Sequence, residues 1–391
     1  METLNFNNTE IAFKAKSDGE LRNSHFLFKA IGYNWLVQIG PAMVNACFAI
    51  HLPIKGIIKA TVFKQFCGGE SINDCELAMN TMHKYGVGTI LDYSVEGEEH
   101  ESVFEATAEE IIRTVKKAAG DKRIPFSVFK VTGVMRFGLL ESLNDGKTPT
   151  EAEAQELSKA KARIEKICQT AYDLNVRIFI DAEESWIQNT IDQIAEEMMM
   201  KYNSQKAIVY NTLQFYRHDR LAYLKEAFKR AEAANYHYGI KLVRGAYMEK
   251  EGERAKQLGY QNPIQPNKEA TDKDYDLALE FCIDNIQKMA ICAGSHNENS
   301  SQLLVSLMAK KGLNKNDERV FFSQLFGMSD HLSYNLAHHG YNVAKYLPYG
   351  PVKSVLPYLF RRAQENTSVQ GQAGRELSLI EKEIKRRKQK A

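Results

Sequence analysis

The ten residues "NVRIFIDAEE" at positions 175–184 carry the pattern that decides the fold. The apolar, β-branched run that ends at Ile180 has the composition of a buried strand. It stops at Asp181, and Glu183 and Glu184 follow before a helical pattern begins. A strand that ends in polar residues and leads into a helix is the repeating unit of parallel α/β proteins.

Eight such runs occur from residue 86 onward, each followed by a helical pattern. They are "GVGTILDYS" (86–94), "PFSVFKVTG" (125–133), "NVRIFIDAEE" (175–184), "KAIVYNTLQ" (206–214), "YGIKLVRGAY" (238–247), "AICAGSH" (290–296), "RVFFSQLFG" (319–327) and "NVAKYLPYG" (342–350). The helical stretches between them are long enough for right-handed crossovers between parallel strands. The sequence therefore predicts an α/β fold, a (β/α)8 TIM-type barrel.

A doubly wound sheet is the alternative arrangement of such a pattern. No GxGxxG follows the first strand run, however, and "NDGKT" at 144–148 lacks the upstream glycine of a P-loop. Residues 1–85 depart from the pattern, so we expect a helical N-terminal region there, a barrel over 86–370 and a basic C-terminal helix over 371–391. Leu377, Ile380 and Ile384 share one face of that last helix, which either packs on the barrel or meets an anionic membrane surface.

Composition narrows the classes of partner. The chain has 391 residues, of which 44% are hydrophobic, and 51 Lys and Arg balance 49 Asp and Glu to a net charge of +2. This balance argues against nucleic acid and favours small molecules. The six cysteines have no metal-ligand spacing, so we expect no metal and a reducing compartment.

The location follows from the first residues. They lack the features of a secretory or transit signal, which predicts the cytoplasm. Residues 30–54 contain no Asp, Glu, Lys or Arg. Because polar residues and prolines interrupt this segment, a packed helical segment is favoured over a membrane span, and docking to a membrane surface or a partner stays open.

Polar residues at the ends of the strand runs are the candidates for chemistry, because barrel active sites form at the C-terminal ends of the strands. In chain order they are Lys130, Asp181, Gln214, Lys241, Arg244, His296 and Tyr346. A strand lysine is costly to bury without an anionic partner, and each of Lys130 and Asp181 can neutralise the other. Glu183 or Glu184 is instead a candidate cap for the next helix.

The stretch "KLVRGAY" contains two cations around a step of small residues. Strand alternation places Lys241, Val243 and Gly245 on one face and Leu242 and Arg244 on the other. Only one of the two cations is therefore expected to point into the mouth of the barrel. The small residues Gly245 and Ala246 would allow a planar ligand or a phosphate to approach the backbone.

The stretch "LPYLFRRAQEN" has two adjacent arginines. Pro357 suits the first turn of a helix, and Tyr358, Arg361 or Arg362, and Glu365 then share one face. Guanidinium forks match the geometry of a carboxylate, so a carboxylate ligand is the functional interpretation. Surface ion pairs along the helix are the structural alternative.

Four motifs in order, "IDAEE", "KLVRGAYMEKE", "KYLPYGP" and "LPYLFRRAQEN", resemble those of proline dehydrogenase, and their wording is similar to the mitochondrial-type enzymes. The resemblance implies a flavoenzyme that oxidises L-proline to Δ1-pyrroline-5-carboxylate, the first step of proline catabolism. It implies FAD as cofactor and a quinone as electron acceptor. The uncharged segment and the basic tail would then be candidates for peripheral contact with the inner membrane.

The resemblance also implies roles for single residues. Arg361 and Arg362 match the pair that binds the substrate carboxylate, Lys130 the third cation, and Glu365 the acid that holds the arginines. The other substrate-binding matches are Tyr346, Tyr358, Leu242 and Tyr247. Asp181, Lys241 and Lys130 match the catalytic centre. The FAD-contacting matches are Gln214, Lys241, Val243, Arg244, Gly245, Ala246, Ser295 and His296.

One residue departs from the resemblance, and two other functions remain open. Lys241 stands where many bacterial members have an arginine beside the flavin N5, and a lysine cannot make the forked contact. Oxidation of trans-4-hydroxyproline is one alternative. It would need room at Tyr346, where relatives that prefer hydroxyproline carry a smaller residue. A non-catalytic carboxylate-binding barrel is the other, and it predicts no bound flavin.

Overall fold

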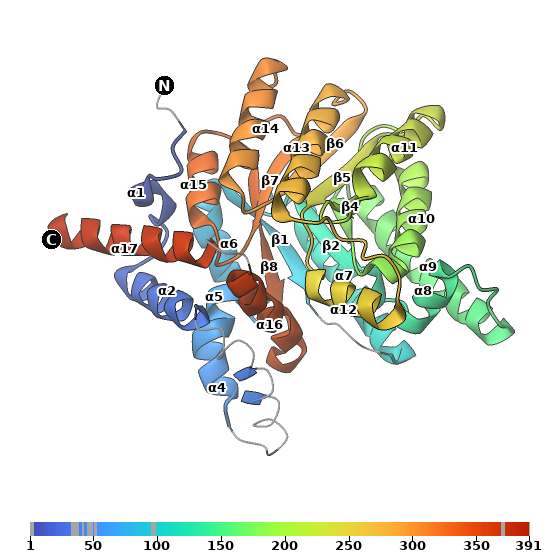
Figure 1. Ribbon diagram of the computed structural model, residues 1–391, viewed down its shortest axis with the longest axis horizontal. Helices are drawn as coiled ribbons and strands as arrows, with labels where there is room; N and C mark the ends of the chain where they lie inside the picture. Colours follow the sequence, from blue (N-terminus) through green and yellow to red (C-terminus); the bar gives the residue numbers. More distant parts are fainter. Residues whose placement is uncertain are drawn as a thin grey trace. The chain divides into compact units, whose positions relative to one another are not determined.

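The structure, a computed structural model, describes residues 4–32, 39–40, 43–44, 50, 53–94, 99–368 and 372–390, but not the side chains of 363–368, 372 and 373. Eight parallel strands form a closed barrel in chain order (Figure 1). They are β1 (Val87–Tyr93), β2 (Phe126–Lys130), β3 (Arg177–Asp181), β4 (Val209–Gln214), β5 (Tyr238–Val243), β6 (Met289–Gly294), β7 (Val320–Leu325) and β8 (Val343–Tyr349).

The predicted (β/α)8 barrel is thus confirmed. Each strand lies within its predicted run, except that β6 begins one residue earlier, at Met289. The register pairs Lys130 with Asp181 across β2 and β3. It also pairs Thr212 with Lys241 across β4 and β5. Partners in a parallel ladder point to the same side of the sheet, so the register brings polar strand ends together.

The chain divides into two compact units, Met1–Thr89 with Gln324–Ala391 (unit 1) and Ile90–Ser323 (unit 2). In unit 2, helices cover the outer side of the strands (Figure 1). They are α7 (Glu101–Ala118), α8 (Phe137–Asn144), α9 (Glu151–Asp173), α10 (Ser185–Tyr202), α11 (Arg220–Ala233), α12 (Met248–Leu258), α13 (Lys268–Asp284) and α14 (Glu298–Lys310), with the 3-10 turn η3 (Val131–Gly133) after β2.

Stacked aromatic rings fill part of the core of unit 2. The rings of Phe126 and Phe179 lie 4.4 Å apart between centroids, and Tyr210 and Phe321 meet the Phe126 ring edge-on. All of these residues lie on strands. Aromatic pairs contribute stability beyond the area they bury, so this cluster gives the strand ends above it a rigid base.

Unit 1 is mainly helical. Besides β8, it contains the helices α1 (Thr9–Ala12), α2 (Asp18–Ile31), α4 (Lys55–Ile58), η1 (Lys59–Phe63), α5 (Lys64–Phe66), η2 (Asn73–Cys75), α6 (Glu76–His83), α15 (Asp330–His338), α16 (Val352–Ser368) and α17 (Gln372–Lys390). α17 packs beside α1 and α2 (Figure 1). Leu379 and Ile380 of α17 join one hydrophobic core with Phe28 and Leu359, and Leu377 and Ile384 pack at its edge.

The basic end of α17 is held by ion pairs. Arg386 and Arg387 both bind Glu383 on the same helix, and Arg387 also binds Asp18 at 2.7 Å. Lys390 pairs with Glu10 at 3.3 Å. Much of this basic cluster therefore binds acidic groups within unit 1. The helix packs as expected of a terminal helix, but the main surface it meets is α1 and α2, whereas the sequence predicted the barrel.

The start of the arginine-bearing helix was predicted wrongly. α16 begins at Val352, and Pro357 lies inside the helix rather than in its first turn. The carbonyl of Pro351 accepts the amide hydrogens of Ser354 and Val355, which makes the earlier proline the residue that starts the helix. Pro357 has no amide hydrogen, so it removes one backbone bond from the helix interior.

Most of the uncharged segment at residues 30–54 lies outside the described residues. Across the part of the chain that is described, no helix is long and apolar enough to cross a bilayer.

Candidate functional site

A buried ion pair lies at the C-terminal ends of the unit 2 strands. The Lys241 ammonium on β5 donates to the Asp181 carboxylate on β3 at 2.5 Å, and only 4% of Lys241 is exposed. The same ammonium lies 5.3 Å from the centroid of the Phe179 ring. Lys130 is the register partner of Asp181. The three residues assigned to the catalytic centre thus lie on β2, β3 and β5, and two of them carry positive charge.

The alternation predicted along β5 is seen in the side chains. Lys241 turns toward Asp181, whereas Arg244 turns toward Asp272 on α13 at 2.6 Å. Arg244 also donates to the hydroxyls of Ser295 and Ser300, at 2.6 and 2.8 Å. Only Lys241 therefore binds at the Asp181 site. Arg244 instead contacts Ser295, which is also assigned to FAD.

The remaining FAD-assigned residues of unit 2 surround a loop of small residues. The Gln214 side chain accepts the amide hydrogen of Ala246 at 3.1 Å. Gly245 has φ of +149°, and a Cβ atom there would lie 2.4 Å from the Tyr216 ring, so a side chain is excluded. Val243 and His296 are half-buried near the ends of β5 and β6.

Two residues assigned to the substrate by resemblance flank this loop. Leu242 is fully buried, on the face of β5 opposite Lys241, and the hydroxyl of Tyr275 donates to its carbonyl at 3.5 Å. Tyr247 is 7% exposed and precedes α12. Their roles at the substrate stay predictions.

Glu183 is a candidate site residue that the sequence interpretation missed. Glu184 is the N-cap residue of α10, as expected for one of the two glutamates, but its side chain makes no capping hydrogen bond. The Glu183 carboxylate accepts the amide hydrogen of Thr132 at 3.0 Å and pairs with its hydroxyl. Burial, and then the charge of Glu184, raises the pKa of Glu183 to about 7. Alternation from Asp181 could have found it, because Glu183 is two residues further along.

The site residues of unit 1 lie on β8 and α16. Tyr346 is 7% exposed, and its carbonyl accepts the amide hydrogen of Phe326 at 2.8 Å. Arg362 is buried, with its guanidinium 5.1 Å from the centroid of the Tyr358 ring. Arg361 is half-buried on the same helix. The side chain of Glu365 lies outside the described residues.

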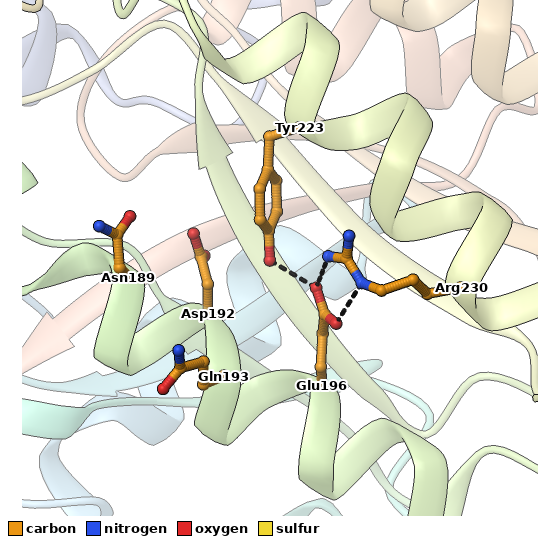
Figure 2. A pocket seen from close by; sticks show the side chains of 6 residues that line it. All are labelled: Asn189, Asp192, Gln193, Glu196, Tyr223 and Arg230. Atoms are coloured by element: carbon orange, nitrogen blue, oxygen red, sulfur yellow. Dashed lines mark hydrogen bonds and ion pairs between the residues drawn. The ribbon is translucent and has the colours of Figure 1, made fainter. Parts of the chain in front are cut away.

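A cavity of about 340 Å³ on the flank of unit 2 is a different kind of feature (Figure 2). Tyr223 and Arg230 of α11 both donate to Glu196 of α10, and Arg220 binds Asp192 at 2.8 Å. The carboxylates are already bound by neighbouring side chains, so we interpret this network as a support between α10 and α11.

The unit 2 residues fit the flavin that the resemblance implies. The Thr212 hydroxyl is buried and has no hydrogen-bond partner among the described residues, and Thr212 is the register partner of Lys241. The position that a Gly245 side chain would take is filled by the Tyr216 ring, so Gly245 can offer a ligand only its backbone. A buried unpaired donor beside a cation suits a polar heterocycle. In the described ranges no group of His, Cys, Asp and Glu gathers that could hold a metal ion.

The profile of the family described as proline dehydrogenase matches residues 75–375. The chain belongs to the proline dehydrogenase family. A member named proline dehydrogenase 1, mitochondrial, from Dictyostelium discoideum is 33% identical over 425 residues, which cover 97% of this chain and 74% of that protein. This chain is therefore an oxidoreductase.

Two further comparisons bear on the substrate and the fold. Hydroxyproline dehydrogenase from Xenopus laevis is 31% identical over 412 residues, covering 96% of this chain and 88% of the relative. The crystal structure of proline utilization A from Bdellovibrio bacteriovorus matches 93% of this chain with a TM-score of 0.72 and 19% identity. This chain spans 37% of that protein, and the likeness shows that the fold is shared.

A double-mutant cycle tests the ion pair of this family member. Asp181→Leu and Lys241→Met should each destabilise the protein by about 3–5 kcal/mol, because each leaves one buried charge without its partner. The double variant should unfold at a higher urea concentration than either single variant. The exposed pair Glu226 and Lys229, 2.8 Å apart, is the control, and its cycle should give a coupling energy of less than about 1 kcal/mol. Additive losses at Asp181 and Lys241 would contradict the coupling.

Proposed function

We propose that this chain is an FAD-dependent proline dehydrogenase that oxidises L-proline to Δ1-pyrroline-5-carboxylate, the first step of proline catabolism. The observation that carries the proposal is the grouping of Lys130, Asp181 and Lys241 at the strand ends of a family member. This arrangement supplies fixed positive charge in a buried place, which suits an anionic substrate group and a reduced flavin.

Cations and aromatic rings are proposed to bind the substrate. Arg361, Arg362 and Lys130 would bind the carboxylate of proline by charge-assisted hydrogen bonds. Tyr346 and Tyr358 would contact the ring, with Leu242 and Tyr247 as further apolar contacts. The cation–π contact of Arg362 with Tyr358 supports the role of the arginine, because it limits the rotamers that the guanidinium can adopt. Glu365 is proposed to hold the arginines.

The flavin would be held by the loop after β5 and by its neighbours. The proposed contacts are Gln214, Lys241, Val243, Arg244, Gly245, Ala246, Ser295 and His296. When bound, the flavin supplies the two-electron oxidant: proline loses a hydride from C5 to it and a proton from nitrogen, which leaves a C=N bond.

The residues of the chain would position the substrate and the flavin and stabilise the charge that develops between them. Asp181 fixes the Lys241 ammonium at 2.5 Å, so the positive charge does not have to be reoriented when negative charge develops. A lysine presents a single charged nitrogen, so it cannot make the forked contact of an arginine. Burial of the pair keeps water from weakening the interaction.

A membrane quinone is the proposed electron acceptor, so we also propose that the protein contacts the membrane. Large apolar side chains are exposed in the N-terminal part of unit 1. They are Phe26, Ile39, Met43, Ile50 and Ile57, from 50% to 68% exposed. Exposed apolar side chains near lysines suit the surface of a lipid bilayer. We propose that the protein resides in the cytoplasm and contacts the inner membrane peripherally.

The activity is tested by colour. Purified protein should be yellow, and L-proline added without oxygen should bleach the flavin absorbance. Protein that binds no flavin would instead support a carboxylate-binding barrel without catalysis. The alternative substrate, trans-4-hydroxyproline, is compared in the same assay, because a relative with that name is 31% identical.

The arginine pair is expected to act mainly on substrate affinity. Arg361→Met and Arg362→Met each remove one charged partner of the carboxylate, a contact of about 1.5–3 kcal/mol, so KM should rise roughly 10- to 100-fold. Steady-state kinetics with L-proline measure this. Lys353→Met, an exposed position on the same helix, is the control. An unchanged KM in both arginine variants would rule out the clamp.

Tyr346 is expected to set the preference for proline. Its ring is nearly buried and its backbone is tied to Phe326, so a hydroxyl at C4 of the substrate would displace the ring at a cost of about 1–3 kcal/mol. Tyr346→Ser should lower kcat/KM for proline and narrow or reverse the preference over trans-4-hydroxyproline. A wild-type enzyme that already prefers hydroxyproline would show the proposed substrate to be wrong.

Membrane contact is tested with liposomes that contain anionic lipid. Phe26→Glu and Ile57→Glu should lower the bound fraction about tenfold, because each replaces an exposed apolar group by a negative charge. Met200→Glu is the control, since Met200 is 59% exposed on α10, outside unit 1. Equal binding by all three variants would contradict the proposed surface.

A further inference from the structure

A line of hydrogen bonds connects the ends of four neighbouring strands in unit 2. The Glu183 carboxylate holds Thr132, which follows β2, through both the amide and the hydroxyl. The carbonyl of Glu183 accepts from the Gln214 side chain at 2.7 Å, and Gln214 accepts from Ala246 at 3.1 Å. Glu183 thus connects the end of β2, where Lys130 lies, to Gln214 and Ala246, two positions assigned to the flavin.

The bonds of Glu183 leave it little freedom to move. The residue is 3% exposed, and its amide hydrogen donates to the side chain of Gln188 on α10 at 2.8 Å. The carboxylate and both backbone groups are therefore all engaged. A carboxyl group that is held this firmly in a buried place fixes its neighbours, and here the neighbour is the turn η3 directly after Lys130.

Charged groups face Glu183 from several elements. Lys130 lies on the β2 side, and Glu184 is its neighbour in sequence. Glu184 is itself paired with Lys250 of α12 at 2.9 Å. Asp181, two residues earlier, binds Lys241. Ionisation of Glu183 therefore adds one negative charge to a group of residues that includes Lys130.

We propose that Glu183 is a positioning residue for Lys130, and that its charge state controls how strongly the β2 end attracts the carboxylate of the substrate. The inference rests on the proposed function. Glu183 need not touch the substrate, because it acts through the Thr132 turn and through the net charge around Lys130. Its interactions are electrostatic and local, so they weaken with distance and with salt.

The direction of the pH effect follows from the site. Burial raises the pKa of Glu183 to about 7, so the carboxyl is mostly neutral below that pH and ionised above it. An ionised Glu183 opposes the approach of an anionic group. KM for L-proline should therefore rise by roughly three- to tenfold between about pH 6 and pH 8 in the wild-type enzyme. The rise is modest because the added charge on Glu183 acts on the substrate carboxylate through a partly screened environment.

The deciding variant is Glu183→Gln. A glutamine can still accept the Thr132 amide hydrogen and pair with its hydroxyl, but it cannot ionise. The rise of KM with pH should be lost in Glu183→Gln, while kcat changes little. A pH profile of KM that is the same in Glu183→Gln as in the wild type would overturn the inference.

Substitutions at two neighbours of Glu183 should shift the pH at which KM changes, in opposite directions. A merely structural role of Glu183 would produce neither shift. Glu184→Gln removes a charge that raises the pKa of Glu183, so the KM transition should move to lower pH. Thr132→Val removes a hydroxyl that lowers the same pKa, so the transition should move to higher pH. These two variants decide the matter if Glu183→Gln does not fold, and the absence of both shifts overturns the inference.

The two proposals fail in different ways. Wild-type protein that carries flavin but is not reduced by proline would refute the proposed function. Wild-type protein that oxidises proline with a KM independent of pH between 6 and 8 would leave the proposed function intact and refute the role of Glu183.

Discussion

The register of the parallel strands is the constraint on which the candidate site depends. Lys130 lies opposite Asp181, and Thr212 lies opposite Lys241, because the ladders of β2 with β3 and of β4 with β5 fix these partners. A shift of one residue in either ladder would turn the side chains to the other face of the sheet. The stacked rings of Phe126 and Phe179 hold the same two strands in place deeper in the core.

The carboxyl groups of Asp181 and Glu183 are two residues apart but have different partners. Asp181 accepts an ammonium hydrogen from Lys241, so its partner carries a positive charge. Glu183 has neutral partners at its carboxylate, and burial raises its pKa to about 7. Buried carboxyl groups that lie two residues apart and have such different partners are typical of functional sites.

Shared fold and shared family carry different weight for function. The proline utilization A structure has 19% identity and a TM-score of 0.72, so it shows how the barrel is built and no more. The relatives above 30% identity place the chain in its family, and one of them is named for hydroxyproline. The choice between the two substrates therefore rests on side chains such as Tyr346 rather than on the fold.

The sequence by itself determined the barrel and the identity of most candidate residues. Eight apolar runs with polar ends specify eight parallel strands, because period and composition are local properties of the chain. Alternation along "KLVRGAY" also separated Lys241 from Arg244 correctly. Local pattern did not locate the start of α16, because both Pro351 and Pro357 can open a helix and only the backbone bonds distinguish them.

Tertiary structure decided which charges meet. Lys241 is 60 residues from Asp181 along the chain, so no local pattern identifies the two as partners. The proposed role of Glu183 depends on Thr132, 51 residues away, and on burial that removes its carboxyl from water. Neither partner choice nor desolvation is encoded in a short stretch of sequence, because both arise only when closure of the barrel brings distant strand ends together.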